Sequence, residues 1–333
     1  MANTKCSKYR ILITHPDIPA KALNMLQEKG YELKISQMPK ESSAPPREIL
    51  LKDVQNMDAI LWFGHVKVDK EMIDAAGERL KVVGSMGAGY DHIDVGLLHQ
   101  RSIRVSNTPD VLSSAVADMA VGLALAVSRN IVTGAAAVKQ GKWIGVHPTW
   151  MCGPTLENAT VGIVGLGAIG SKILQRVKAF DVKEVLYYNR REKNKDEANG
   201  ACYTSLDELL KKSDFIFLTV PSNKDSKGLI DKNAFKKMKN TAILINSARG
   251  DVINQDDLVM ALENKEIGGA GLDVTQPEPL PVDHKLLKFD NVVVTPHISS
   301  ATFQAREKMA VLAAENIICA LENKVMPTPI QRQ

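Results

Sequence analysis

Residues 161–170 of this 333-residue chain, Val161-Gly-Ile-Val-Gly165-Leu-Gly167-Ala-Ile-Gly170, are the strongest indication of its fold class. The first four residues of this stretch are an apolar run typical of a buried strand, and residues from Ile169 to about Phe180 have the pattern of a helix. Between them, Gly165 permits a tight turn, Gly167 lets the backbone approach a pyrophosphate, and Gly170 lets the helix pack on the strand. The helix start offers N–H groups and a positive dipole end to phosphates. The motif predicts a dinucleotide-binding turn; the alternative is a glycine-rich turn without a ligand.

Strand-like and helix-like segments alternate on both sides of this motif, which is typical of βαβ units and a mostly parallel sheet. Before it, strands are expected at 10–14, 31–35, 59–63 and 81–85, with a helix at 20–29. From Thr160 onward, strands are expected at 161–164, 185–188, 215–220, 242–246, 269–273 and 292–295. This second series has the strand number of a full dinucleotide-binding fold.

Three further segments bear on the domain organisation. Residues 113–129 carry Ala, Val, Leu and Met around most of a helix, and a helix that is apolar all round must be buried in a core or in a subunit interface. Residues 139–155, with Gly, Pro and two Trp, are expected to be irregular. A last helix is expected at 302–321, with one apolar face.

The composition excludes several classes of protein. Apolar residues make up 44% and charged residues 24%, close to the average for globular proteins, so disorder, collagen-like repeats and coiled coils fit poorly. The net charge of +4 is too small to indicate nucleic-acid binding; a local basic site for an anionic small molecule fits better. The cysteines Cys6, Cys152, Cys202 and Cys319 lie far apart without a CxxC pair, so we expect reduced thiols, no metal site and no disulfide framework.

No membrane partner is expected from the sequence. Residues 1–10 are polar and lack the apolar run of a signal peptide. The most apolar stretch, 119–127, is too short to span a bilayer, which needs about 20 residues. We therefore expect a cytoplasmic protein.

The residue type at the end of the second strand of the dinucleotide fold indicates whether NAD or NADP is bound. An acidic residue there accepts hydrogen bonds from the ribose 2′-hydroxyl, whereas a basic one accommodates a 2′-phosphate. This chain has Asn189-Arg190-Arg191 at that point, and guanidinium groups match phosphate oxygens with paired hydrogen bonds. We predict NADP(H) as the preferred cofactor. If both arginines are only solvated surface charges, the choice stays open and NAD(H) is the alternative.

Three residues that follow later strands have the side chains that reduction of a ketoacid requires. Arg249 can hold a carboxylate through paired hydrogen bonds, His297 can protonate a developing alkoxide, and Glu278 can orient that imidazole. Ligands of doubly wound sheets bind beyond the carboxyl ends of the strands, where all three should lie. Taken singly, each has an ordinary structural explanation: an ion pair for the arginine, a solvated loop for the glutamate and a structural Pro-His for the histidine. Their joint occurrence after a dinucleotide-binding turn favours a reacting centre.

Seven segments carry a family resemblance: 86–94 (MGAGYDHID), 107–110 (NTPD), 160–170 (TVGIVGLGAIG), 245–251 (INSARGD), 271–274 (GLDV), 277–281 (PEPLP) and 296–302 (PHISSAT). With these segments in this order, the chain resembles the D-2-hydroxyacid dehydrogenase family over essentially its whole length. The likeness is nearest to the eukaryotic glyoxylate/hydroxypyruvate reductase branch.

The resemblance implies roles for individual residues. Arg249, Glu278 and His297 would be catalytic, with Arg249 on the substrate carboxylate and His297 as the proton donor. Further substrate contacts would come from Ala88 and Gly89, through their backbone N–H groups, and from Trp150, which would lie near the pocket of a neighbouring subunit. Asp273 would hold the nicotinamide carboxamide. The expected cofactor-binding residues are Thr108, Gly165, Gly167, Ala168, Ile169, Gly170, Asn189, Arg190, Arg191, Val220, Pro221, Ser247, Asp273 and Ser300.

The resemblance also implies two doubly wound parallel-sheet domains, with a Rossmann cofactor domain inserted into a flavodoxin-like substrate domain. Residues 1–109 and 303–333 would form the substrate domain, and residues 110–302 the NADP-binding domain. A homodimer is expected, with the helix that begins at Ser113 in its interface.

The sequence departs from the family pattern at two points. Ser299 stands in His297-Ile-Ser-Ser300 where the family usually has Gly, which places a Cβ where the backbone often passes the nicotinamide. Ser222 follows Val220-Pro221 where a larger apolar residue is common. Neither change removes a catalytic group, so we expect activity to survive.

The resulting functional hypothesis is NADPH-dependent reduction of glyoxylate and hydroxypyruvate, by hydride transfer, to glycolate and D-glycerate. One alternative is a D-2-hydroxyacid dehydrogenase with a broad range of substrates. The other, from a different class, is a non-enzymatic binding protein of the same fold that responds to NAD(P)H. Turnover of a small ketoacid separates the last hypothesis from the first two.

Overall fold

A computed structural model describes residues 9–39 and 44–331 of the chain. The chain divides into two compact units: residues 1–112 with 302–333, and residues 113–301. The second unit is continuous in sequence and separates the two segments of the first. Cys6 and most of the N-terminal stretch that was searched for a signal peptide lie outside the described residues.

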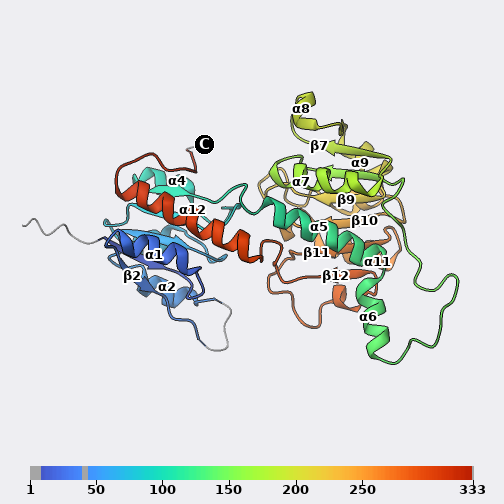
Figure 1. Cartoon of the computed structure of the whole chain (residues 1–333), viewed down its shortest axis with the longest axis horizontal. Helices are drawn as coiled ribbons and strands as arrows, with labels where there is room; N and C mark the ends of the chain where they lie inside the picture. Colours follow the sequence, from blue (N-terminus) through green and yellow to red (C-terminus); the bar gives the residue numbers. More distant parts are fainter. Residues whose placement is uncertain (1–8, 40–43, 332–333) are drawn as a thin grey trace, which may run out of the picture. The chain divides into compact units, whose positions relative to one another are not determined.

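The first unit is a five-stranded parallel sheet with helices on both faces (Figure 1). Its strands are β1 (Arg10–Ile13), β2 (Glu32–Ile35), β3 (Ala59–Trp62), β4 (Val82–Ser85) and β5 (Arg104–Ser106). Its helices are α1 (Ala20–Glu28), α2 (Arg47–Asp53), α3 (Lys70–Ala76), α4 (Val95–Gln100) and α12 (Phe303–Leu321). The strand order β2-β1-β3-β4-β5 is the flavodoxin-like order of a doubly wound sheet.

Helix α12 returns from the end of the chain and packs beside α1 over β3 and β4. Gly84 of β4 makes this close approach feasible, since a Cβ there would lie 2.9 Å from Cγ1 of Ile317. The segment after α12 is fixed by Asn316, which is fully buried: its Nδ2 donates to Oγ1 of Thr328 (2.9 Å), and its Oδ1 accepts the N–H of Thr328 (3.0 Å). Thr328 in turn donates to the carbonyl of Asn107 (2.7 Å).

The second unit is a seven-stranded parallel sheet with the order β12-β11-β10-β9-β6-β7-β8. Its strands are β6 (Thr160–Val164), β7 (Glu184–Tyr188), β8 (Cys202–Tyr203), β9 (Phe215–Leu218), β10 (Ile243–Asn246), β11 (Gly269–Leu272) and β12 (Val292–Val294). Its α-helices are α5 (Ser113–Ser128), α6 (Ile131–Lys139), α7 (Ala168–Val177), α8 (Lys195–Ala198), α9 (Leu206–Lys212), α10 (Lys232–Phe235) and α11 (Gln255–Glu263). Short 3-10 helices cover Lys178–Phe180, Gly250–Val252 and Lys285–Lys288. The order is that of a Rossmann sheet with one strand added beyond the sixth, so the predicted fold class is confirmed.

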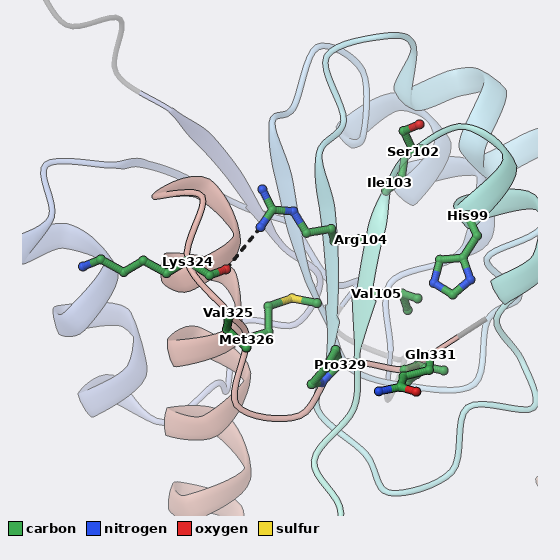
Figure 2. Close-up of a pocket in the computed structure, with 11 residues that line it drawn as sticks. His99, Ser102, Ile103, Arg104, Val105, Lys324, Val325, Met326, Pro329 and Gln331 are labelled. Atoms are coloured by element: carbon green, nitrogen blue, oxygen red, sulfur yellow. Dashed lines mark hydrogen bonds between the residues drawn. The ribbon is translucent and has the colours of Figure 1, made fainter. Parts of the chain in front are cut away.

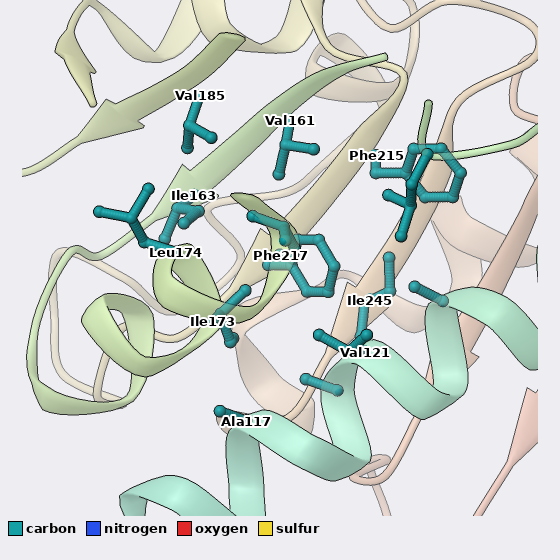
Figure 3. Close-up of a cluster of buried hydrophobic side chains, with 14 of the residues drawn as sticks. Ala117, Val121, Val161, Ile163, Ile173, Leu174, Val185, Phe215, Phe217 and Ile245 are labelled. Carbon is teal, nitrogen blue, oxygen red and sulfur yellow. The ribbon is translucent and has the colours of Figure 1, made fainter. Parts of the chain in front are cut away.

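Helices α5 and α7 cover one face of this second sheet. Figure 3 shows Ala117 and Val121 of α5 and Ile173 of α7 directed towards Phe217 and Ile245 of the strands. Helices α9, α10 and α11 pack on the opposite face. The all-round apolar pattern of α5 is therefore explained within its own unit, because α5 is buried against both the sheet and α7.

The strands β5 and β8 and the helix α6 were not expected, and the shorter helices between the other strands were expected only in general, without residue ranges. Strands β5 and β8 have three and two residues, too few to show an alternating pattern of their own. Helix α6 follows directly on α5 and contains Val, Thr and Gly, which are weak helix formers. The residues after α6, up to the start of β6, are irregular as expected.

Among the described residues, no single helix is long and apolar enough to cross a membrane. Helices α5 and α6 meet the length and composition criteria only as a pair, which is bent by 61°.

Candidate active site

The predicted residues of the second unit, with the exception of Trp150, lie at one edge of its sheet. They follow the carboxyl ends of six parallel strands: Gly165 after β6, Asn189 after β7, Val220 after β9, Ser247 and Arg249 after β10, Asp273 after β11, and His297 and Ser300 after β12. All strand pairs are parallel, so these ends meet at the same edge, which is where doubly wound folds bind ligands.

The glycine turn after β6 has the geometry that a bound pyrophosphate requires. Gly165 has φ = +104°, and a Cβ there would lie 2.8 Å from Cγ1 of Val220. A Cβ on Gly170 would lie 2.4 Å from the carbonyl oxygen of Gly165. By contrast, a Cβ on Gly167 would meet no protein atom within 4 Å. Gly165 and Gly170 are therefore needed by the protein itself, whereas the bare backbone at Gly167 borders space that a ligand can use.

Helix α7 begins at Ala168 and continues through Ile169, with Gly167 as its N-cap and no side-chain hydrogen bond to cap it. Its first N–H groups and the positive end of its dipole suit an anionic group. Together with the space at Gly167, this observation shows that the turn fits the phosphates of a dinucleotide cofactor.

The segment after β7 is tied to the glycine turn. Oδ1 of Asn189 accepts the N–H of Leu166 at 2.7 Å, so the side chain of Asn189 bridges the two strand ends. Arg190 and Arg191 follow and are exposed. Nη1 of Arg190 lies 3.5 Å from Oδ2 of Asp225, in a pair whose side chains are both about three quarters exposed. Such an exposed pair is weak, which leaves the guanidinium group able to bind an anionic ligand.

His297 and Glu278 form a pair. Nδ1 of His297 lies 2.9 Å from Oε2 of Glu278, and Oε1 of the same carboxylate accepts the N–H of Thr275 at 3.0 Å. The two side chains are 29% and 31% exposed, so both are held by the protein and reachable by a small molecule. His297 has a left-handed backbone, with φ = 54°, an uncommon conformation for a residue with a side chain.

Asp273 fixes this unusual backbone. Its side chain is buried, and its carbonyl oxygen accepts the N–H of His297 at 2.9 Å. Its Oδ1 accepts the N–H of Ile298 (2.9 Å) and the hydroxyl of Thr295 (2.6 Å), and its Oδ2 accepts the N–H of Ser299 (2.7 Å). Asp273 thus holds the loop that carries His297, a function that the sequence did not indicate.

Arg249 lies in a strand-end turn that is held by Asn246. Nδ2 of Asn246 donates to the carbonyl of Arg249 (2.9 Å), and its Oδ1 accepts the N–H of Ala248 (3.0 Å). The next residue, Gly250, packs so closely that a Cβ there would lie 2.0 Å from the carbonyl oxygen of Thr275. The Arg249 turn therefore packs against the segment that positions Glu278.

Ser247 and Ser299 each carry a buried hydroxyl that has no hydrogen-bond partner within residues 9–39 and 44–331. Both follow strand ends at the same sheet edge. At Ser299 the Cβ that the family usually lacks is accommodated without disturbing the backbone bond to Asp273. At the other departure from the family pattern, the hydroxyl of Ser222 donates to Oδ2 of Asp251 at 2.8 Å.

The predicted residues of the first unit also follow strand ends. Ala88 and Gly89 come after β4, and Thr108 comes after β5. Nδ2 of Asn107 donates to the carbonyl of Ala88 (2.7 Å), and the N–H of Thr108 donates to the carbonyl of Gly87 (2.9 Å). The segment after β4 that carries Ala88 and Gly89 is therefore joined by hydrogen bonds to the segment after β5 that carries Thr108.

The structure does not connect Trp150 with the strand-end residues. Its ring contacts that of His147, with the ring centroids 6.5 Å apart, and no interaction described for residues 9–39 and 44–331 links it to the strand ends of its unit. It belongs to an exposed segment in which the side chains of Trp143, Ile144 and Val146 are 60%, 87% and 87% exposed.

The side chains that support the site were not predicted from the sequence; they are Thr219, Asn246, Thr275 and Thr295. Oγ1 of Thr219, for example, donates to the carbonyl of Gly165 at 2.5 Å and so holds the glycine turn. All four are polar residues at the carboxyl ends of predicted apolar strands, and that position is the signal by which they could have been found.

A cavity of about 420 Å³ lies elsewhere, beside β5 in the first unit (Figure 2). Arg104, Lys324 and Met326 line it, and none of the predicted site residues does. The chemistry described above is therefore not at this cavity.

Comparisons with known proteins agree with this site. Residues 121–299 match the family model "D-isomer specific 2-hydroxyacid dehydrogenase, NAD binding domain". A glyoxylate reductase of Pyrococcus furiosus is 42% identical over 331 residues, covering 98% of this chain and 96% of that protein. The human glyoxylate reductase/hydroxypyruvate reductase is 41% identical over 304 residues, covering 91% and 92%.

A solved structure is similar as well. The NADPH-dependent glyoxylate/hydroxypyruvate reductase from Sinorhizobium meliloti, in complex with NADP and malonate, superposes with a TM-score of 0.83 at 31% identity, covering 98% of this chain and 99% of that one. These matches extend over nearly the whole chain and include both units. The chain belongs to the D-isomer-specific 2-hydroxyacid dehydrogenase family of oxidoreductases, in the branch that contains the glyoxylate reductases.

Proposed function

We propose that this protein reduces glyoxylate and hydroxypyruvate to glycolate and D-glycerate, with NADPH preferred over NADH. The observation that carries the proposal is the His297–Glu278 pair, which lies at the same sheet edge as Arg249 and the glycine turn. The names of the relatives support the substrates, and the name of the S. meliloti enzyme supports the cofactor.

The cofactor would be held by the second unit. The Gly165–Gly170 turn and the start of α7 would bind the pyrophosphate, and Arg190 with Arg191 would bind the 2′-phosphate. Val220 and Pro221 would flank the adenine end, and Ser247, Ser300 and Asp273 would lie along the nicotinamide half. When bound, the cofactor supplies the hydride that reduces the ketone carbon.

Arg249 binds and orients the substrate in this proposal. Glyoxylate and hydroxypyruvate share a carboxylate next to the carbonyl, and a guanidinium group matches a carboxylate with two parallel hydrogen bonds. The backbone N–H groups of Ala88 and Gly89 would add donors from the first unit, and Thr108 would contact the cofactor from that unit. Holding both reactants in one orientation supplies a large part of the acceleration.

His297 donates the proton to the oxygen that becomes the new hydroxyl. Its Nδ1 is the atom that contacts Glu278, so we assign the donation to its Nε2. The carboxylate of Glu278 fixes the orientation of the ring, and the N–H of Thr275 fixes the carboxylate. We propose that the first unit is the substrate domain and that the second unit is the cofactor domain.

We also propose a homodimer, with the helix that begins at Ser113 in its interface and with residues 131–150, which follow that helix, in contact with the second copy. This stretch exposes Ile131, Val132, Trp143, Ile144 and Val146, each more than half exposed. Exposed apolar side chains concentrated in one stretch of chain are typical of protein interaction sites, and Trp150 belongs to the same stretch. Size-exclusion chromatography with light scattering tests the dimer, and a monomer at micromolar concentration contradicts it.

The experiment that tests the activity is oxidation of NADPH and of NADH with glyoxylate, hydroxypyruvate and pyruvate. Fast turnover of the first two with NADPH supports the whole proposal. Preference for NADH keeps the chemistry but removes the 2′-phosphate role of the arginines. Equal turnover of pyruvate favours a broad-range dehydrogenase, and no turnover in a protein that binds cofactor favours a binding protein.

A further inference from the structure

Two tyrosines stand side by side at the end of the second sheet. Tyr187 on β7 and Tyr203 on the two-residue strand β8 are paired in register, and their ring centroids lie 5.4 Å apart. Tyr187 is buried in the core, whereas Tyr203 is 40% exposed. Tyr187 lies in a strand that was expected from the sequence, whereas Tyr203 lies in β8, which was not expected.

The hydroxyls of these tyrosines hold the two ends of one short segment. The hydroxyl of Tyr203 donates to the carbonyl of Asn189 at 3.2 Å, and the hydroxyl of Tyr187 accepts the N–H of Lys193 at 3.0 Å. The side chain of Asn189 adds a third bond, to the N–H of Leu166 in the glycine turn. Residues 189–193 are therefore fixed at both ends, and the exposed Arg190 and Arg191 lie between the fixed points.

We propose that Tyr203 is a positioning residue that sets the preference for NADPH over NADH, by presenting the Arg190–Arg191 segment to the 2′-phosphate. This inference rests on the proposed function, in which these arginines bind that phosphate. Ordering a segment on binding costs conformational entropy, and a segment that is already held costs less to order. The bond from Tyr203 touches the backbone only, so its effect reaches the ligand through Asn189 and the residues that follow.

The test removes the Tyr203 hydroxyl and keeps its ring. Tyr203→Phe retains the tilted ring contact with Tyr187 and loses only the bond to Asn189. The matched control is Tyr188→Phe, one residue further along β7: its side chain packs in the cluster on the other face of the sheet, and its hydroxyl has no hydrogen-bond partner within residues 9–39 and 44–331. Calorimetry measures binding of adenosine 2′,5′-bisphosphate and of 5′-AMP, which differ by the 2′-phosphate.

We expect Tyr203→Phe to weaken binding of the 2′,5′-bisphosphate by about two- to tenfold, the usual range for one hydrogen bond. Binding of 5′-AMP should stay within error, as should kcat with NADPH, while KM for NADPH rises and KM for NADH does not. Tyr188→Phe should leave the ratio of the two affinities unchanged. Because 5′-AMP is an internal reference, a general loss of stability would lower both affinities and leave their ratio intact.

An unchanged affinity ratio in Tyr203→Phe overturns the positioning role. The double variant Arg190→Ala/Arg191→Ala separates this failure from failure of the proposed function. If the double variant loses the preference for the 2′,5′-bisphosphate and Tyr203→Phe keeps it, only the tyrosine inference is wrong. If the wild-type protein has no such preference, the 2′-phosphate role of the arginines is wrong, and the tyrosine inference is wrong with it.

Discussion

Oδ2 of Asp273 accepts the backbone N–H of Ser299 at 2.7 Å, two residues beyond His297. With the bonds from Ile298 and Thr295, this contact makes one buried carboxylate the anchor of the loop that carries the imidazole. The orientation of His297 therefore depends on a residue on the neighbouring strand end as well as on Glu278.

Asp273→Asn should lower kcat by about 10- to 100-fold, the cost of a small misplacement of a reacting group. The substitution replaces one acceptor oxygen by an NH2 group, which would face a backbone N–H or the hydroxyl of Thr295. Steady-state kinetics with hydroxypyruvate measure this effect. Thr295→Val, which removes one donor and leaves both oxygens, should have a smaller effect. If Asp273 served only to bind cofactor, the change would appear in the Kd for NADPH with kcat intact.

Arg249→Ala should raise KM for glyoxylate by about 10- to 150-fold, since a charged hydrogen-bonding partner of the substrate is lost. The Kd for NADPH, measured by fluorescence titration, should change little because the predicted cofactor contacts remain. Arg249→Lys should restore only part of the affinity, as an ammonium group cannot form the paired bonds. Near-normal kinetics in the alanine variant would show that the carboxylate binds elsewhere.

His297→Ala should abolish turnover while NADPH still binds, because the proton donor is lost and the cofactor contacts are not. Glu278→Gln keeps a hydrogen bond to Thr275 but removes the charge beside the ring, and should lower kcat by about 100-fold, the lower end for proton-transfer groups. The pH profiles of kcat in both variants, compared with that of wild type, check these roles. A fully active His297→Ala would exclude this residue as the acid.

The two glycines of the turn should respond oppositely to alanine. Gly170→Ala places a Cβ 2.4 Å from a backbone oxygen and should destabilise the second unit, with a lower Tm. Gly167→Ala places its Cβ where no protein atom lies within 4 Å, so Tm should be unchanged while affinity for NADPH drops about tenfold or more. Thermal unfolding with and without NADPH distinguishes them, and a Gly167→Ala protein with wild-type affinity would contradict the phosphate site.

Glu322 should contribute a stabilisation that depends on pH. Hydrogen bonds from Lys29 (2.7 Å) and Lys324 (2.6 Å) lower the pKa of this carboxyl from its ordinary 4.5 to about 2. A lowered pKa means that the contribution is fully present above pH 4.5 and is lost as pH falls towards 2. Glu322→Gln should therefore reduce Tm by only about 1–2 °C at pH 7, as both lysine partners are exposed to solvent, and the difference should vanish near pH 2. NMR titration of the Glu322 carboxyl checks the pKa directly.

Most of the fold could be predicted because long apolar strands and their glycine turns have patterns of their own. Strands β5 and β8 could not, since β5 has the mixed sequence Arg-Val-Ser and β8 has only two residues, so neither contains an apolar run like the Val-Val-Val of β12. The failure to predict β8 matters most, because the hydrogen bond from Tyr203 to Asn189 depends on the pairing of this strand with β7.

The strand-end position of Arg249, Asp273 and His297 was predictable for a general reason, namely that the carboxyl ends of parallel strands meet at one edge. The bonds that support them were not. Asp273 contacts residues more than twenty positions away, and Thr219 reaches Gly165 across more than fifty. Such pairs are set by strand order and register, which local sequence patterns do not contain.

The return of α12 to the first sheet dictates an order of events during synthesis. The second unit is continuous and precedes α12 in the chain, so all of it has been synthesised before residues 303–321 are made. Until then the face of β3 and β4 that Ile317 will cover is open at Gly84, and Asn107 lacks its bond from Thr328. The unit whose strands are translated first is thus the last to be completed, and a nascent chain carries an uncovered apolar sheet face through most of its translation.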